Sequence, residues 1–380
     1  PGPSTIYGRH LLAAVREGRV SEARVDERVA TLLLLIERTR AHERPASSAE
    51  QTVDDANERE VIRRAAAAGA VLVRNERDAL PLVPGSVDSI AVLGPNARVT
   101  RTQGGGSSGL QAIESVSLLR GLAERYGEDI IHYRRGVSID KLAPIIDDDT
   151  LRTPDGGRGW RVEYYDRDDV TGPPRRVDTT LQSALTYFGA APPGVDPFDF
   201  TVVVSGTVVD DPQGLLPRGR EYFGFGSEEQ LHGILMKAGV PVRIEARMRT
   251  RAGFSALRIG IRAPENPREF DDAVALAEKC GTAIVVVGTN DEWETEGHDR
   301  DSIALPGRQD ELVSRVARVA ERTIVVINAG APVAMPWLKE VDAVLIGFFG
   351  GMEMSRAIAD VLSGARDPGG RLPVVYPHRL

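Results

Sequence analysis

Three features are scarce or missing in this sequence, and each absence narrows what the chain can be. Its 380 residues include a single cysteine, Cys280, which excludes an internal disulfide and any metal site built from several cysteines. No apolar run approaches the roughly 18 residues that a membrane-spanning helix needs. Basic residues are not in excess: 47 Lys and Arg stand against 55 Asp and Glu, and the net charge of −8 argues against nucleic acid as a partner.

An initiating methionine and a phosphate-binding motif are missing as well. The chain begins at Pro1 and shows no signal peptide, so we expect a fragment or a processed product, and the compartment, bacterial cytoplasm or secreted, stays open. The glycine-rich residues 102–108 contain neither Gly-Lys-Ser/Thr nor GxGxxG, so phosphate binding is not expected. The composition, 42% hydrophobic and 27% charged, is typical of a soluble chain of two or three globular domains.

The most informative stretch runs from an apolar strand into a loop crowded with acids. Residues 283–287 are a short β-branched run closed by Gly288, as expected of a parallel-sheet strand covered on both faces. Six carboxylates follow between Asp291 and Asp301. Ligands bind at the loops that leave the carboxyl ends of such strands. A solvated acidic loop is the commoner explanation for a run of charge, and the pattern alone leaves both open.

Two features of this loop favour a catalytic or ligand-binding role over a solvated surface loop. Trp293 stands among the acids, where a solvated loop has no use for an indole ring. Glu294 and Glu296 are two residues apart, so in an extended loop they would point the same way and raise each other's pKa. A carboxyl group that keeps its proton near neutral pH is what a general acid requires. The loop is therefore a candidate catalytic or ligand-binding site.

The same loop resembles that of a known enzyme family. Residues 290–300, NDEWETEGHDR, and then LPGRQ at 305–309 are similar to the acid/base loop of family 3 glycoside hydrolases, the β-glucosidases. The resemblance implies that Glu296 is the general acid/base and that the substrate is bound by Trp293, Glu294 and Arg300. His298 departs from the family pattern, because an aromatic residue is common there; the departure concerns a local contact to the sugar.

Two tryptophans could serve as platforms for a sugar ring. Trp293 belongs to the acidic loop, and Trp337 is the last residue of a motif, N-x-x-x-P-V-x-x-P-W, that this chain shares with the family from Asn328 onward. Aromatic rings stack on apolar faces, but burial in a core is the commoner fate of tryptophan.

The first 40 residues predict two helices that cannot form a domain alone. Residues 11–17 and 21–37 have helical patterns, with Ser21 as N-cap of the second. Apolar residues of the second helix fall on one face: Val25, Val29, Leu32, Leu33 and Ile36. The resemblance implies that residues 1–40 are the C-terminal helices of a catalytic (β/α)8 barrel, that the barrel's aspartate nucleophile lies upstream of this sequence, and that the missing barrel is a partner of the rest. Residues 41–56 are polar and read as a linker.

Two separated segments, residues 57–155 and 263–380, predict one α/β sandwich domain. Strand and helix patterns alternate, with strands expected at 90–96, 283–287, 323–328 and 341–347. We expect residues 57–75 to be helical, running into the apolar residues 70–73. The predicted fold is a three-layer α/β sandwich with a mostly parallel sheet.

Residues 156–262 interrupt that domain and lose the alternation. Short strands with period-two patterning are expected at 160–165, 200–206, 242–248 and 257–261, which indicates an all-β insert. The insert resembles a PA14 domain, a sugar-associated β-sandwich found in some β-glucosidases of this family. Between Val209 and Arg220 it lacks strands that the family has. Either the insert is reduced or residues are omitted from the sequence, and we favour omission because the closing half is intact.

The resemblance implies a retaining β-glycosidase acting on β-linked glucosides, with this chain supplying the acid/base half of the site. Such enzymes use two carboxyl groups about 5–5.5 Å apart and need neither metal nor organic cofactor. By resemblance to arginine-rich bacterial members of the family that carry this insert, the aglycone of the substrate is expected to be a natural product such as a macrolide. One alternative is a non-catalytic carbohydrate-binding module built on the PA14-like insert. Another is a flavodoxin-like protein with a cation-binding acidic loop, although the loop lacks the EF-hand spacing of calcium ligands. Sugar specificity, aglycone and oligomeric state stay open.

Overall fold

The structure is a computed structural model that forms two compact units, Pro1–Val53 and Asp54–Leu380. It describes residues 7–44, 52–110, 112–144, 146, 151–188, 191–208, 214–219, 230–234, 240–251, 254–262, 266–296 and 299–378. The division at Val53 falls within the expected linker.

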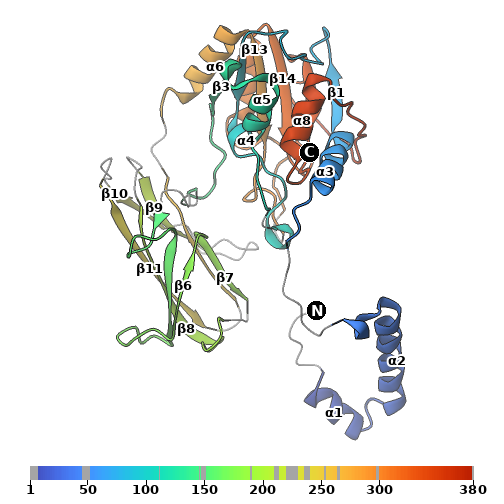
Figure 1. Ribbon diagram of the computed structural model, residues 1–380, viewed down its shortest axis with the longest axis vertical. Helices are drawn as coiled ribbons and strands as arrows, with labels where there is room; N and C mark the ends of the chain where they lie inside the picture. Colours follow the sequence, from blue (N-terminus) through green and yellow to red (C-terminus); the bar gives the residue numbers. More distant parts are fainter. Residues whose placement is uncertain are drawn as a thin grey trace. The chain divides into compact units, whose positions relative to one another are not determined.

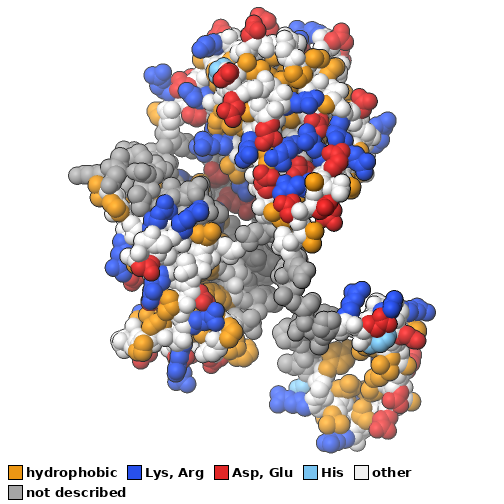
Figure 2. All heavy atoms as spheres, in the orientation of Figure 1, with side chains coloured by type: hydrophobic (Ala, Val, Ile, Leu, Met, Phe, Trp, Pro, Cys, Tyr) orange, Lys and Arg blue, Asp and Glu red, His pale blue; other side chains and the backbone are white. Residues whose placement is uncertain are grey.

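The first unit contains the two expected helices, α1 (Arg9–Arg16) and α2 (Glu22–Thr39), followed by the short turn η1 (Ala41–Glu43). Ser21 caps α2 as predicted, because its Oγ accepts a hydrogen bond from the backbone N–H of Arg24 at 3.3 Å. The apolar face of α2 is uncovered within this unit, and hydrophobic side chains show there on the surface (Figure 2). The exposed residues are Val29, Leu32, Leu33, Leu34 and Leu35.

The second unit is built on a six-stranded sheet in the order β1-β15-β14-β13-β2-β3 (Figure 1). Its strands are β1 (Val71–Asn75), β2 (Ile90–Leu93), β3 (Ile131–Arg134), β13 (Thr282–Gly288), β14 (Arg322–Asn328) and β15 (Ala343–Ile346). All neighbours pair in parallel except β1, which runs antiparallel to β15. The mostly parallel sheet is confirmed. The helix expected to reach residue 75 ends earlier: α3 spans Ala56–Gly69, and the β-branched residues beyond it form β1.

Helices cover both faces of this sheet, so the three-layer prediction is also confirmed. Alternate residues of β13 enter two different cores: Val285 and Val287 pack in one, Ile284 and Val286 in the other. The first core contains side chains from α6 (Glu269–Cys280) and α7 (Gln309–Ala317). The second contains side chains from α3, α4 (Pro95–Arg98), α5 (Leu118–Tyr126) and α8 (Met354–Ser363). The short turns η2 (Gly106–Ser108) and η3 (Glu128–Ile130) complete the helical elements that the structure describes here.

Every regular element described between residues 151 and 262 is a strand, as the period-two pattern predicted. The strands are β4 (Leu151–Arg152), β5 (Trp160–Asp166), β6 (Arg176–Thr180), β7 (Ala184–Phe188), β8 (Asp199–Val208), β9 (Gly214–Gly219), β10 (Gln230–Ile234), β11 (Val242–Arg251) and β12 (Phe254–Ile259). They form two antiparallel sheets, β11-β8-β5-β6 with β4 beside β8, and β10-β9-β12-β7. A core that includes Trp160, Tyr164 and Phe200 holds the β insert together.

Two details differ from the sequence-based expectation for the β insert. Its sheet already begins at β4, before residue 156, because Leu151 pairs with Val208. Within the stretch between Val209 and Arg220, residues Gly214–Gly219 form β9, so a strand does lie there. Residues 209–213 and 220 lie outside the described residues, as do residues 1–6 and residues 45–51 of the expected linker.

Candidate active site

A cleft of about 460 Å³ lies where the loops that follow β13 and β14 meet a glycine-rich loop. It is lined by Gly104, Gly105, Ser108, Trp293, Glu294, Thr295, Glu296, Asp299, Arg300 and Ala331. This is the carboxyl edge of a parallel sheet, the usual location of ligand sites in α/β folds. All four residues predicted for the site, Trp293, Glu294, Glu296 and Arg300, line this one cleft.

The end of β13 is held by a buried glutamine, Gln309. This residue ends the second part of the sequence motif, at 305–309, and it binds the backbone just before the first part, at 290–300. Gln309 accepts a hydrogen bond from the N–H of Gly288 at 2.8 Å and donates to the carbonyls of Gly288 and Pro306, both at 2.9 Å. Gly288 has to be glycine, because a Cβ there would lie 1.9 Å from the carbonyl oxygen of Asn328. The acidic loop therefore leaves the sheet from a rigid point.

The loop then turns, which corrects the expectation of an extended segment. The N–H groups of Trp293 and Glu294 both donate to the carbonyl of Asn290, at 3.0 and 2.9 Å. Glu294 and Glu296 consequently meet different neighbours. The carboxylate of Glu294 accepts from Thr289 Oγ1 at 2.5 Å and from the N–H of Gly330 at 3.2 Å.

Glu296 lies against the glycine-rich loop instead. Gly105 donates its N–H to the carbonyl of Glu294 at 2.9 Å, which joins the two loops. A Cβ added at Gly106, where φ is +74°, would lie 2.6 Å from the Cβ of Glu296. The glycine at position 106 lets the backbone approach the side chain of Glu296 more closely than any larger residue would allow.

Arg300 lies beside Glu294 with little exposure to solvent. Its Nη1 is 4.0 Å from Glu294 Oε1, the two side chains are 12% and 13% exposed, and its Nη2 donates to the carbonyl of Pro332. Nη1 has no hydrogen-bond partner in the part of the chain that the structure describes. A buried guanidinium with an unused donor next to the cleft is suited to bind a hydroxyl group of a ligand. Gly297 and His298, the departure from the family pattern, lie outside the described residues.

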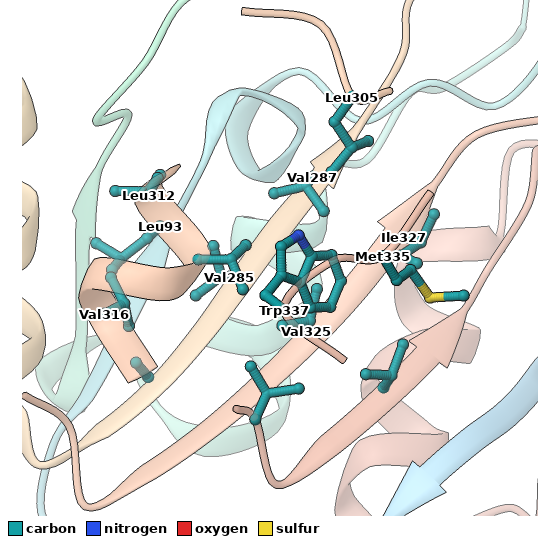
Figure 3. Packing of buried hydrophobic residues seen from close by; sticks show 14 of the residues in the cluster. Leu93, Val285, Val287, Leu305, Leu312, Val316, Val325, Ile327, Met335 and Trp337 are labelled. Carbon is teal, nitrogen blue, oxygen red and sulfur yellow. The ribbon is translucent and has the colours of Figure 1, made fainter. Parts of the chain in front are cut away.

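The two tryptophans have different surroundings. Trp293 is half-buried at the cleft, donates from Nε1 to the carbonyl of Ile139 at 2.7 Å, and has Lys141 Nζ 4.0 Å from its ring centroid. Trp337 is fully buried among Val285, Val287 and other core residues (Figure 3), and its Nε1 donates to Asp310 at 2.7 Å. Trp337 is thus a core residue, and the idea that it is a sugar platform is wrong.

Sequence reasoning missed several residues around the cleft. Asp299 and Ser108 line it, and Glu292, which precedes Trp293 in the loop, has a side chain that is only 8% exposed. Burial raises the pKa of Glu292, although Arg258 and two backbone N–H groups oppose the shift. Nothing in the local pattern separates Glu292 from the other five acids, because its partners are distant in sequence.

The described residues contain no group of three or more His, Cys, Asp and Glu side chains placed to hold a metal ion. None of the described helices is both long and apolar enough to cross a membrane.

Comparisons with known proteins bear on this site. Residues 70–380 match the profile described as "Glycosyl hydrolase family 3 C-terminal domain". Over its full length the chain is 33% identical to a beta-glucosidase of Rhizobium radiobacter and 32% identical to a probable beta-glucosidase I of Aspergillus flavus, covering 49% and 50% of them. The chain therefore spans about half the length of the curated relatives it matches.

Two solved structures of beta-glucosidases are also similar to this chain. The crystal structure of beta-glucosidase from Kluyveromyces marxianus in complex with glucose matches all of this chain with a TM-score of 0.90 and 26% identity, and the match covers 51% of that chain. DesR, a beta-glucosidase from Streptomyces venezuelae in complex with D-glucose, matches 96% of this chain with a TM-score of 0.61 and 25% identity, over 44% of its own length.

Proposed function

This chain belongs to glycoside hydrolase family 3, and we propose that the whole protein is a β-glucosidase that retains configuration at the anomeric carbon. The observation that carries the proposal is the position of Glu296. It lines a cleft at the carboxyl edge of the sheet together with Glu294, Trp293 and Arg300.

In the proposed mechanism Glu296 acts twice. As an acid it gives a proton to the glycosidic oxygen while a second carboxylate attacks the anomeric carbon and the aglycone leaves. As a base it then takes a proton from the water that attacks the glycosyl-enzyme, which releases the sugar and regenerates both groups. We assign the attacking carboxylate to an aspartate of the barrel, outside this chain, with α1 and α2 as the barrel's last helices.

Three other side chains bind the sugar in this proposal. Glu294 is oriented by Thr289 and Gly330, so it can accept from a sugar hydroxyl. Arg300 offers Nη1 beside it. Trp293 lines the cleft with part of its ring, and Lys141 lies over another part of the same ring. Polar groups of fixed orientation next to an aromatic ring are the usual composition of such pockets.

We assign the β insert to the PA14 type and regard it as an insertion between two parts of a single α/β domain. Its proposed role is to select the aglycone. A natural-product glucoside is one candidate substrate. A non-catalytic carbohydrate-binding module is the alternative, and the insert does have a cleft of about 370 Å³ next to Tyr164 and Tyr187. Those rings are only 6% and 8% exposed, so they offer little face for stacking on a sugar, and the glycosidase is the better-supported function.

Substitution of Glu296 in the full-length protein tests the proposal. Glu296→Ala removes the proton donor, and general acid catalysis contributes about 10²–10⁴-fold, so alkyl glucosides should lose activity on that scale. Aryl glucosides with a good leaving group should form the glycosyl-enzyme almost as fast as before. Azide should restore turnover, because it attacks the glycosyl-enzyme without a general base. Rates for a series of leaving groups, with and without azide, measure both effects.

Glu294→Ala is the matched control, because it removes a second carboxylate from the same cleft. It should weaken binding without the leaving-group dependence and without rescue by azide. Rescue of Glu294→Ala but not of Glu296→Ala would show that the wrong glutamate is named. If neither variant shows a dependence of the rate on the leaving group, the general acid lies outside this loop.

A further inference from the structure

Glu292 is an acid of the loop that does not line the cleft, and its side chain is only 8% exposed. Its Oε2 accepts from the backbone N–H groups of Lys141 and Leu142, at 2.7 and 3.1 Å. Its Oε1 accepts from Arg258 Nη2 at 2.8 Å. A buried carboxylate that has lost its water is stable only with partners of this kind.

These partners belong to the two places where the chain crosses between the α/β sandwich and the β insert. Residues 139–144 lead into the insert, and Arg258 lies on β12, which leads out of it. The two crossings lie side by side, because the N–H of Ile261 donates to the carbonyl of Pro144 at 2.8 Å. Arg262 also donates to the carbonyl of Lys141, at 2.9 Å.

Trp293, the next residue, is attached to the same crossing. Its indole N–H donates to Ile139, and Lys141 lies over its ring. The backbone that holds Glu292 therefore also holds the ring that lines the cleft. Any movement of residues 139–142 displaces both side chains together.

We propose that Glu292 and Arg258 form a latch that ties the β insert to the acidic loop and thereby holds Trp293 in position at the cleft. Glu292 is a positioning residue, since it acts on the cleft through Trp293. The consequence for catalysis rests on the proposed β-glucosidase function. The consequence for the position of Trp293 does not.

Tryptophan fluorescence tests the latch without any reference to activity. Of the three tryptophans in this sequence, Trp160 and Trp337 are fully buried, so the part of the acrylamide quenching that Trp293→Phe removes reports on Trp293. Arg258→Met and Glu292→Gln should each increase the quenching constant and shift the emission to longer wavelength. The double variant should resemble either single variant, because each removes the same interaction. Measurements on Trp293→Phe give the contribution of the buried tryptophans, which is subtracted.

A matched pair in the same insert provides the control. Arg243 and Glu245 on β11 form an Arg–Glu ion pair at 3.0 Å, but both side chains are largely exposed. Arg243→Met and Glu245→Gln should leave quenching unchanged. A role of Glu292 in stability alone would lower the melting temperature and leave quenching of the native state at 20 °C as in the parent protein, and that result would overturn the latch.

Activity of the full-length protein gives the second readout. Arg258→Met and Glu292→Gln should lower kcat/KM by about tenfold, because small misplacement of a substrate-contacting group is costly. Additive losses in the double variant would contradict the latch. So would unaltered quenching in either single variant. A failed leaving-group test of Glu296 alongside altered quenching would refute the proposed function and keep the latch.

Discussion

At the scale of single residues, the cleft depends on glycines as much as on acids. Gly106 has a positive φ of 74° and lies against Glu296, so two separate costs follow from any side chain there. One is backbone strain, of about 1–2 kcal/mol. The other is displacement of the proposed acid/base, which affects chemistry and not only stability.

Gly106→Ala should therefore reduce kcat/KM by about 100-fold for glucosides with poor leaving groups, since a shift of about 1 Å at a catalytic group costs that much. Gly85→Ala separates strain from displacement. Gly85 also has a positive φ, of 84°, but a Cβ there meets nothing within 4 Å. Both variants should melt at a lower temperature, and only Gly106→Ala should lose activity. Equal activity in the two would show that Glu296 does not depend on Gly106.

At the scale of elements, the helices on one face of the sheet are joined by charge. Asp360 of α8 is 3% exposed and accepts two hydrogen bonds at 2.7 Å from Arg63 of α3. Arg366 also donates to it, at 3.1 Å. Positive and negative side chains are interleaved over the α5–α8 face (Figure 2). Burial alone would raise the pKa of Asp360, but Arg63 and Arg366 outweigh it and hold that pKa below its ordinary value.

Asp360→Asn should lower the free energy of unfolding by roughly 3 kcal/mol at pH 7, because it removes the buried charge that pairs with the partly buried guanidinium groups of Arg63 and Arg366. A carboxyl group with a lowered folded-state pKa stabilises the fold above its unfolded pKa of about 3.9, and this stabilisation is lost as pH falls through the folded value. Urea unfolding between pH 3 and 7 should thus show the two proteins converging at the acid end.

The exposed pair Glu311–Arg308 serves as the control for Asp360. Glu311→Gln should change unfolding little at any pH, since surface ion pairs contribute little. If the free energy of unfolding differs between Asp360→Asn and the parent protein by the same amount at every pH, the side chain acts through its shape and not through its charge.

At the scale of the whole unit Asp54–Leu380, the β insert has its own core, built around Trp160 and Phe200. Its entry and exit are adjacent at Pro144 and Ile261. A chain in which two glycines join these residues should keep a cooperatively folded α/β sheet, because an inserted unit with its own core contributes little to the core of its host. Circular dichroism and thermal unfolding check this.

The same deletion should change substrate preference, because Arg258 leaves with the insert. In the full-length protein, the ratio of kcat/KM for two glucosides that differ only in the aglycone should change. A broad, non-cooperative unfolding transition would show instead that the sheet needs the insert.

Local patterns in the sequence determined a large part of this protein. The period of two predicted the strands of the insert, and the β-branched run before Gly288 predicted the buried strand β13. The loop and the motif at 305–309, through their resemblance to a known family, predicted residues that line one cleft. Gln309 of that motif binds Gly288, which is only 21 residues away. These features depend on short-range geometry, which sequence spacing records directly.

The tertiary structure decided what spacing could not record. The turn after Asn290 separates Glu294 from Glu296, which an extended loop would have aligned. Trp337 is a core residue only because β13 and its neighbours surround it. Glu292 meets Lys141 across 151 residues of chain, so its role is invisible in a list of six acids. Interactions of this kind exist only once the sheet and the insert have brought distant segments together. For that reason residues that line the cleft could be predicted from the sequence, while the contacts that support them could not.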